Sequence, residues 1–472
     1  MVASEAAPFA KTGGLADVVG SLPKALSGQG VESAVVMPRY GSISLDGAHR
    51  VWERLVLSLG MHSITCDIWR QDYQGIPFFF IDCPWLFDRP GIYNAYGQDY
   101  GDNYLRFATL CQGALGTLRF LYPADVLHVH DWQAALAAAY LKTRHSLDPA
   151  LRGVKVVFTI HNLEHQGRFG PHVFRELALD SWLMEPGYLE YFGDVNFLKA
   201  GILFSDAITT VSPRYAEEIQ TPEFGCGLDG LLRQHKSRLR GILNGVDYTE
   251  WDPATDPLLP ARYSERDLSG KGVCKRYLKS RMGVDGNGTR PLVGFVSRFA
   301  RQKGFDMLAE ILPELLDTED VNMVFIGSGE RRYEDFFSGL APLYPGRVSG
   351  VIGYDNELAH QLEAGVDVFL MPSLFEPCGL NQMYSLRYGT PPVVRATGGL
   401  DDTVDAETGF KFSGYNPRDL LASIRQALAE YGDTTAWKRR MRAGMARDFS
   451  WNASAARYAE LYRDLARSPV SQ

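Results

Sequence analysis

Two cations stand five residues apart in a loop between an apolar run and an amphipathic segment. The stretch SRFARQKGFD places Arg298 and Lys303 there, with Gln302 beside them. Two cations fixed at the end of a strand can hold a diphosphate and neutralise the charge that develops on a leaving phosphate. A solvated basic loop is the alternative, and the position at a predicted strand end favours the phosphate site.

A carboxylate stands in the polar stretch FEPCGLNQ. Glu376 follows the apolar run VFLMPS, and Gly379 opens a segment predicted to be helical from near Leu380. A carboxylate beside helix N-terminal amides can bind sugar or ribose hydroxyl groups while neighbouring groups bind phosphate. The alternative is an acidic residue that only caps the start of the helix.

A glycine turn of the form T-G-G-L-x-D-x-V occurs twice, in KTGGLADVV from Lys11 and in ATGGLDDTV from Ala396. In the first copy, Gly13 and Gly14 precede a helix predicted over residues 15–26. Glycines let the backbone approach an oxyanion, and a helix N-terminus favours negative charge. Phosphate contact and a tight helix-capping turn are equally open. We expect the two turns to face one cleft as similarly built half-sites, with Lys11 as the asymmetric addition.

Polar residues also follow two apolar runs in the first half of the chain. HVHDWQ places Asp131, Trp132 and Gln133 after one run, and TIHNLEHQG places His161 and Asn162 after another. Trp132 could stack on a sugar, although a core tryptophan is the better interpretation of this residue alone. The two histidines of HVHD could be a metal pair, but buried, hydrogen-bonded imidazoles fit an apolar strand better. Nothing resembles H-E-x-x-H.

The elements that must position these residues alternate between strands and helices. DVLHVH, VKVVFTIH and DAITTVS in the first half, and PLVGFVSR, VNMVFIGSG, VDVFLMPS and PPVVRAT in the second, are typical of buried parallel strands. Amphipathic segments such as FDMLAEILPELLD and PRDLLASIRQALAEYG lie between them. This pattern predicts an α/β protein with two doubly wound parallel sheets. Only the short run VAS stands before EAAPFAKTGG, where a doubly wound domain normally has its first buried strand, so this strand is either short or lacks a few initial residues.

The Pro-, Asp- and Gly-rich stretch GILNGVDYTEWDPATDPLLPARYS marks the boundary. We predict an N-terminal domain over residues 1–243 and a second domain over residues 244–450. Residues 451–472 are predicted to form a C-terminal helix that packs back on the first domain.

Length and composition limit the function classes. A chain of 472 residues favours two domains, and 45% hydrophobic with 22% charged residues is typical of a soluble protein. A net charge of −8 argues against nucleic-acid binding and, weakly, against anionic membranes. No apolar run of about 18 residues and no signal-peptide pattern occurs. Six scattered cysteines indicate a reducing compartment, so we expect a cytoplasmic protein, or a plastid-stroma protein without its transit peptide if the source is a plant.

Taken together, these stretches closely resemble bacterial glycogen synthases and plant starch synthases, a family of retaining glucosyltransferases with two Rossmann-like domains. Nine motifs occur in order over essentially the whole chain: KTGGLADVVGSLPKAL, VMPRY, HVHDWQ, TIHNLEHQG, TVSPRYAEEI, LNGVD, SRFARQKG, FEPCGLNQ and YGTPPVVRATGGLDDTV. The resemblance implies a GT-B fold, with two doubly wound domains facing a deep interdomain cleft. It also implies glucose transfer from ADP-glucose to the non-reducing end of an α-1,4-glucan, with UDP-glucose as the alternative donor.

The resemblance also implies roles for individual residues. As catalytic residues it implies His161, Glu376, Lys303, Arg298 and Asp131. As donor-binding residues it implies Lys11, Gly13, Gly14, Asp17, Asn244, Arg298, Gln302, Lys303, Tyr354, Glu376, Cys378, Gly379, Leu380 and Asn381. On the acceptor or sugar side it implies Tyr93, Asn162, Trp132 and Gln133. No metal and no prosthetic group are expected, and the partners are a nucleotide sugar and a glucan.

The chain departs from the family pattern in a few places. Leu374 stands where arginine is common, and Asn381 stands where threonine is frequent; neither change removes a charged catalytic group. Tyr384 lies eight residues after Glu376, so the E-x7-E pattern of a related transferase family is absent, in agreement with the synthases.

Other function classes explain less of the sequence. A glycosidase needs two carboxylates, for which Glu376 and Asp131 qualify, but the basic loop and glycine turns would be unexplained. A nicotinamide-dependent oxidoreductase predicts G-x-G-x-x-G, which has no convincing instance. A glucan phosphorylase needs a lysine-bound pyridoxal phosphate and a longer chain. A non-catalytic glucan-binding protein would not need Arg298, Lys303 and Glu376 together.

Overall fold

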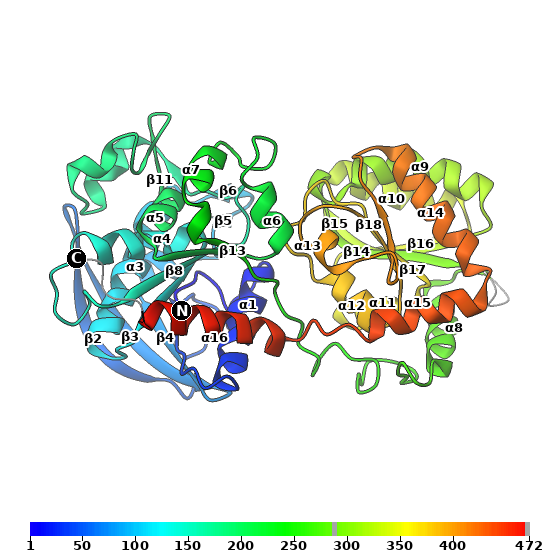
Figure 1. Ribbon diagram of the computed structural model, residues 1–472, viewed down its shortest axis with the longest axis horizontal. Coiled ribbons are helices and arrows are strands. Elements are labelled where there is room, and N and C mark those ends of the chain that lie inside the picture. Colours follow the sequence, from blue (N-terminus) through cyan, green and yellow to red (C-terminus); the bar gives the residue numbers. More distant parts are fainter. Residues whose placement is uncertain (286–289, 468–472) are drawn as a thin grey trace. The chain divides into compact units, whose positions relative to one another are not determined.

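The computed structural model describes residues 1–285 and 290–467, and its chain divides into two compact units (Figure 1). The first unit contains Met1–Val211, Ala216–Gly245 and the C-terminal segment from Trp451. The second contains Ser212–Tyr215 and Val246–Ser450. The chain therefore leaves the first unit, builds most of the second, and returns to the first at its C-terminal helix.

The second unit is built on a parallel sheet with the strand order β16-β15-β14-β17-β18-β19. The order runs outward in one direction from β14 and then reverses at β17, which makes a switch point between these two neighbours. Its strands are β14 (Leu292–Phe299), β15 (Asn322–Gly329), β16 (Val348–Ile352), β17 (Val368–Met371), β18 (Pro392–Arg395) and β19 (Phe410–Phe412). This arrangement confirms the doubly wound α/β class predicted from the apolar runs.

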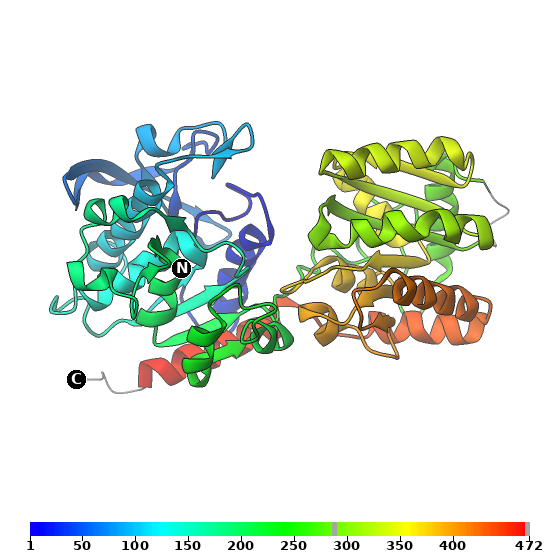
Figure 2. The same cartoon turned by 90° about the horizontal axis from the view of Figure 1, so that it is seen from above.

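Helices cover both faces of this sheet (Figure 2). Buried phenylalanines from β14, β15 and the helices α9 and α10 pack into one aromatic core, in which the rings of Phe295 and Phe337 meet edge-on with centroids 5.4 Å apart. The helices are α8 (Ser269–Met282), the 3-10 turn η4 (Arg301–Lys303), α9 (Phe305–Thr318), α10 (Arg331–Leu343), α11 (Asn356–Gly365), α12 (Asn381–Arg387), α13 (Gly398–Thr403), α14 (Pro417–Tyr431) and α15 (Thr434–Met445).

The first unit has a mixed sheet whose two halves meet at Val2. The halves have the orders β13-β12-β8-β7 and β1-β4-β3-β2, and Val2 forms single bridges to Val129 and Val36. In the described residues, Val2 alone occupies the place of the expected first strand. The strands are β1 (Val35–Pro38), β2 (His49–Leu59), β3 (His62–Tyr73), β4 (Ile76–Asp82), β7 (Val126–His130), β8 (Lys155–Ile160), β12 (Ala207–Thr210) and β13 (Leu239–Gly241).

Shorter strands and the helices of the first unit surround this sheet. The short strands are β5 (Asn94–Ala95), β6 (Gln98–Asp99), β9 (Arg168–Phe169), β10 (Glu190–Tyr191) and β11 (Asp194–Asn196). The helices are α1 (Gly14–Ser27), α2 (Pro84–Phe87), α3 (Asn103–Phe120), α4 (Asp131–Lys142), η1 (Pro171–Glu176), η2 (Ser181–Met184), α5 (Phe197–Phe204), α7 (Asp229–Gln234), η3 (Lys236–Arg238) and α16 (Trp451–Arg467). Helix α6 (Pro213–Glu218) lies at the boundary of the two units.

The C-terminal helix α16 packs against α1. Val18, Leu22 and Leu26 of α1 share one buried cluster with Trp451 and Tyr458 of α16. The apolar faces of two helices that are more than 400 residues apart in sequence thus close one core. None of the helices in the described ranges is long and apolar enough to cross a membrane.

Candidate active site

A lysine and a glutamate meet at the switch point of the second unit. Lys303 comes from the turn η4 after β14, and Glu376 comes from the loop after β17. Lys303 Nζ lies 2.7 Å from Glu376 Oε2, and the hydroxyl of Ser373 donates to the same oxygen at 3.0 Å. The Glu376 side chain is 6% exposed and that of Lys303 is 23% exposed. An ion pair is therefore held where an open α/β sheet binds its ligand.

The second glycine turn supports the Glu376 loop from behind. The amide of Gly399 donates to the carbonyl oxygens of Glu376, at 3.1 Å, and Pro377, at 3.3 Å. A Cβ atom on Gly399 would lie 2.1 Å from the Cys378 carbonyl oxygen, and one on Gly398 would lie 1.9 Å from that of Glu376. This turn needs glycine for close packing. The amide of Gly399 donates to protein carbonyl groups, whereas the repeated motif predicts a half-site whose amides face a ligand.

The first glycine turn is open instead. A Cβ atom built on Gly13 or Gly14 would meet nothing within 4 Å, so no packing contact requires glycine there. Lys11 Nζ pairs with Asp17 Oδ1 at 2.6 Å, and the Lys11 side chain is 55% exposed. Thr12 donates from its hydroxyl to Glu5 Oε2 at 2.9 Å and anchors the turn. Space in front of the glycines and a solvated cation beside them are what a phosphate contact needs.

The other predicted donor residues of the second unit gather around the same strand ends. Arg298 is near the end of β14 and donates to Gln302 Oε1 at 3.3 Å. The Asn381 amide donates to the Val296 carbonyl at 2.8 Å, which ties the start of α12 to β14. Tyr354 follows β16, is 70% exposed, and donates to Asn356 Oδ1 at 2.9 Å.

Three further predicted residues lie in the loop between β17 and α12. Gly379 has φ +70°, and a Cβ atom there would lie 2.5 Å from Gln382 Oε1. Cys378 is buried, and Leu380 directly precedes α12.

Asn244 belongs to the first unit, where it is buried and its Oδ1 has no partner among the described residues.

In the first unit, Asp131 and His161 follow the neighbouring strands β7 and β8. Asp131 has φ +55°, and its Oδ1 accepts the backbone N–H of His161 at 2.7 Å. Burial raises the pKa of Asp131 to about 7, and the nearby charge of Glu5 acts in the same direction. Asn162 accepts the Glu164 amide at 3.0 Å, which closes a turn. The carboxylate thus fixes the backbone that carries His161.

The histidines of HVHD are buried and hydrogen-bonded, as predicted. His128 lies between the Tyr462 hydroxyl, 2.7 Å from Nδ1, and the Thr159 hydroxyl, 2.5 Å from Nε2. His130 Nδ1 lies 3.0 Å from His161 Nε2. Burial lowers the pKa of His161 to about 3, so its ring is neutral at physiological pH. Within residues 1–285 and 290–467 no cluster of potential metal ligands occurs.

The predicted acceptor-side residues are largely packed into the first unit. The Tyr93 hydroxyl is hydrogen-bonded to the Ser4 hydroxyl at 2.7 Å. Trp132 is 9% exposed, and its ring meets that of Phe107 edge-on at 5.1 Å. Gln133 is buried in α4. The core interpretation of Trp132 is therefore correct for most of its surface.

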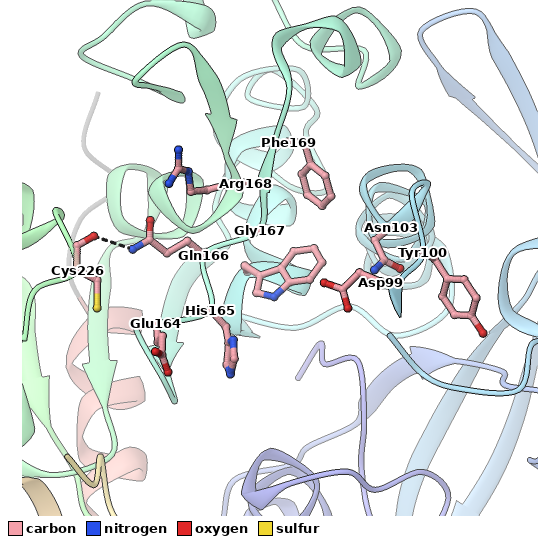
Figure 3. A pocket seen from close by; sticks show the side chains of 11 residues that line it. Asp99, Tyr100, Asn103, Glu164, His165, Gln166, Gly167, Arg168, Phe169 and Cys226 are labelled. Carbon is pink, nitrogen blue, oxygen red and sulfur yellow. Dashed lines mark hydrogen bonds between the residues drawn. The ribbon is translucent and has the colours of Figure 1, made fainter. Parts of the chain in front are cut away.

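An exposed edge of Trp132 lines a hollow of about 460 Å³ in the first unit. Figure 3 shows residues of the loop after β8 on one side of the hollow and residues near the start of α3 on the other. Gln166 donates to the Cys226 carbonyl at 3.0 Å and closes one side. The lining residues are Asp99, Tyr100, Asn103, Trp132, Glu164, His165, Gln166, Gly167, Arg168, Phe169 and Cys226. The motif TIHNLEHQG contains four of them, and no motif signalled Asp99, Tyr100 or Asn103.

Comparison with known proteins shows which class of protein has this fold: it is a glycosyltransferase of the GT-B fold. Residues 1–234 match the family model described as the starch synthase catalytic domain, and residues 280–444 match the model of group 1 glycosyl transferases. The chain is 48% identical to glycogen synthase from Anaeromyxobacter dehalogenans (strain 2CP-1 / ATCC BAA-258), over 98% of each chain. The chain belongs to the glycogen synthase and starch synthase family.

Other relatives agree. Glycogen synthase from Koribacter versatilis (strain Ellin345) is 45% identical, over 98% of this chain and 96% of its own. The catalytic domain of starch synthase IV from Arabidopsis thaliana, solved with ADP and acarbose, is 32% identical with a TM-score of 0.90 over 99% of both chains. Sucrose-phosphate synthase from Thermosynechococcus elongatus, at 18% identity and a TM-score of 0.61 over 98% of both chains, shares the fold alone.

Proposed function

We propose that this chain transfers glucose from ADP-glucose to the non-reducing 4-hydroxyl of an α-1,4-glucan with retention of configuration. The Lys303–Glu376 pair at the switch point carries the proposal, because it offers a cation for phosphate beside a carboxylate for sugar hydroxyl groups. The Arabidopsis relative, whose structure contains ADP, supports an adenine nucleotide as the donor group.

The donor is activated by cations rather than by a metal in this proposal. Arg298 and Lys303 hold the diphosphate, and Lys11 adds a third positive charge from the open glycine turn. Charge develops on the diphosphate as the bond from glucose C1 to the phosphate oxygen breaks. Preorganised cations aimed at that oxygen stabilise the transition state by several kcal/mol.

The transfer takes place on one face of the glucose ring. The acceptor 4-hydroxyl forms its bond to C1 on the side from which the diphosphate departs, and its proton passes to a diphosphate oxygen. The configuration at C1 is therefore retained without a nucleophilic carboxylate. The neutral ring of His161 and the carboxylate of Glu376 hydrogen-bond the sugar during this step.

The hollow beside Trp132 takes the glucan in this proposal. It combines aromatic edges from Trp132 and Phe169 with polar groups such as Asp99 and Arg168, which is the composition that carbohydrate sites use. His161 and one side of this hollow belong to the segment that follows β8.

Label transfer tests the proposal. Glycogen is incubated in parallel with ADP-[14C]glucose, UDP-[14C]glucose and [14C]glucose 1-phosphate, and the product is digested with β-amylase. We expect label chiefly from ADP-glucose, with complete release as maltose because the new bond is α-1,4. Preferential transfer from UDP-glucose would make UDP-glucose the donor instead of ADP-glucose, and transfer from glucose 1-phosphate would indicate a phosphorylase. Label that resists β-amylase would contradict the formation of an α-1,4 bond.

A further inference from the structure

A row of buried side chains leads from the C-terminal helix to His161. Tyr462 of α16 is hydrogen-bonded to His128, whose second ring nitrogen is bonded to Thr159. The rings of His128 and His130 pack against each other at a tilt of 32° with centroids 4.1 Å apart, and His130 is hydrogen-bonded to His161. Because His128 is held at both nitrogens, it fixes the position of the His130 ring that packs against it.

The His130–His161 hydrogen bond has two alternative proton arrangements. In the first, His130 Nδ1–H donates to His161 Nε2, so that His161 carries its own proton on Nδ1. In the second, His161 Nε2–H donates to His130 Nδ1, and His130 must then carry its proton on Nε2.

The surroundings of His130 decide between them. His130 is fully buried, and its Nε2 has no hydrogen-bond partner among the described residues. The second arrangement would leave a buried N–H without an acceptor, whereas the first leaves only a lone pair. Orphaned buried N–H groups are the rarer and costlier case.

We propose that His130 is a positioning residue that fixes His161 as its Nδ1–H tautomer and so presents a hydrogen-bond donor to the sugar. In the described part of the chain, Nδ1 of His161 has no protein partner, which leaves it free to donate to a sugar hydroxyl oxygen. The tautomer assignment follows from this structure alone, while its use on a sugar rests on the proposed function. Burial lowers the pKa of both rings, so the pair remains neutral during turnover.

Nitrogen NMR tests the tautomer without any substrate. The full chain is labelled with [15N]histidine, and the His161 ring signals are assigned by their loss in His161→Asn. We expect a protonated Nδ1 and an unprotonated Nε2 at neutral pH. An unprotonated Nδ1 with a protonated Nε2 overturns the proposal, whether or not the protein transfers glucose.

Variants test whether His130 acts through His161. His130→Phe removes the donor, and we expect kcat/KM to fall about tenfold, the effect of one lost hydrogen bond. The same change in a His161→Phe background should cost nothing further, since its target is already gone. His130→Asn, whose amide can donate near the position of Nδ1, should restore part of the loss.

Controls separate positioning from general damage to the fold. His49→Asn changes an exposed histidine on β2 and should leave kcat/KM within twofold of the wild type. If His130→Phe lowers kcat/KM equally in the wild-type and His161→Phe backgrounds, its role is structural and the proposal fails. If no variant of the chain, nor the wild type, transfers glucose, the proposed function fails while the NMR result still decides the tautomer.

Discussion

Lys303 Nζ lies 2.7 Å from Glu376 Oε2, and the two side chains come from loops that follow the adjacent parallel strands β14 and β17. The ion pair is therefore a consequence of the sheet order, because only neighbouring strands bring their loops so close. Glu376 is almost fully buried and holds the lysine in one position. In the proposed function, a phosphate would find its cation already oriented, which would lower the entropic cost of binding.

Replacement of Lys303 by alanine should lower kcat far more than it weakens glucan binding. In the proposed mechanism the lysine meets the leaving phosphate, whose charge is greatest in the transition state, so we expect a loss of about 100-fold or more in kcat. Steady-state kinetics with varied ADP-glucose and glycogen checks this. Arg425→Ala, which breaks surface ion pairs on α14, is the control. Unchanged turnover in Lys303→Ala would remove the phosphate role.

The two glycine turns should respond differently to a methyl group. Gly399→Ala places a Cβ atom against the Cys378 carbonyl, so the Glu376 loop must shift; both the melting temperature and activity should fall. Gly13→Ala meets open space at φ −155°, so the fold should keep its melting temperature while the KM for the donor rises. Thermal unfolding and donor kinetics on both variants test this contrast. An unchanged donor KM in Gly13→Ala would show that no ligand approaches the first turn.

Asp131→Asn should stabilise the protein increasingly as the pH rises. The unfolded chain releases the Asp131 proton near pH 4, while burial holds it in the folded protein to about pH 7. The folded state thus binds more protons in this interval, and ionisation of Asp131 costs stability progressively from pH 4 to 7, with the full cost above pH 7. Asparagine avoids this cost and can still accept the His161 amide.

The measurement for Asp131 is a series of melting temperatures between pH 4.5 and 8. The difference between Asp131→Asn and the wild type should grow up to about pH 7 and then level off. Asp72→Asn is the control, because Arg70 lowers the pKa of Asp72, so the contribution of this ion pair varies with pH only at acid pH and should stay constant over the series. A constant difference over the series would show that Asp131 titrates normally.

Asp99→Ala should weaken the binding of the glucan without affecting the binding of the donor. Asp99 lines the hollow beside Trp132 and is exposed there, so its carboxylate can accept sugar hydroxyl groups. We expect the KM for glycogen to rise about tenfold, within the range for hydrogen bonds to charged groups, and the KM for ADP-glucose to stay unchanged. The exposed Asp46→Ala serves as control. An unchanged KM for glycogen would place the hollow outside the acceptor path.

The second unit was the more predictable from sequence. Strands buried on both faces are nearly continuous apolar runs, so PLVGFVSR and VDVFLMPS signal β14 and β17 directly. The hairpin of β2 and β3 was not among the predicted strands, because its exposed residues interrupt every apolar run. Its place in the mixed sheet depends on pairing with β4, a contact that no local pattern encodes.

The candidate site was predictable in its residues but not in its contacts. The positions of Glu376 and Lys303 at strand ends mark them as site residues, but a spacing of 73 residues along the chain does not indicate that their side chains pair. No sequence pattern predicts the hollow, because its lining is scattered from Asp99 to Cys226 over loops, short strands and the first residues of α3 and α4. The two glycine turns share a sequence but differ in their surroundings, because another loop packs against the second turn and none of the described loops packs against Gly13 and Gly14 of the first.

The return of the chain to its first unit determines when that unit can finish folding during synthesis. The core around Val18 and Leu22 needs Trp451 and Tyr458, which a ribosome adds only after the whole second unit. At 5–20 residues per second, the segment from residue 246 to 450 takes about 10–40 s to make. The first unit thus begins to fold first and finishes last, and until then it exposes an apolar face that chaperones can cover.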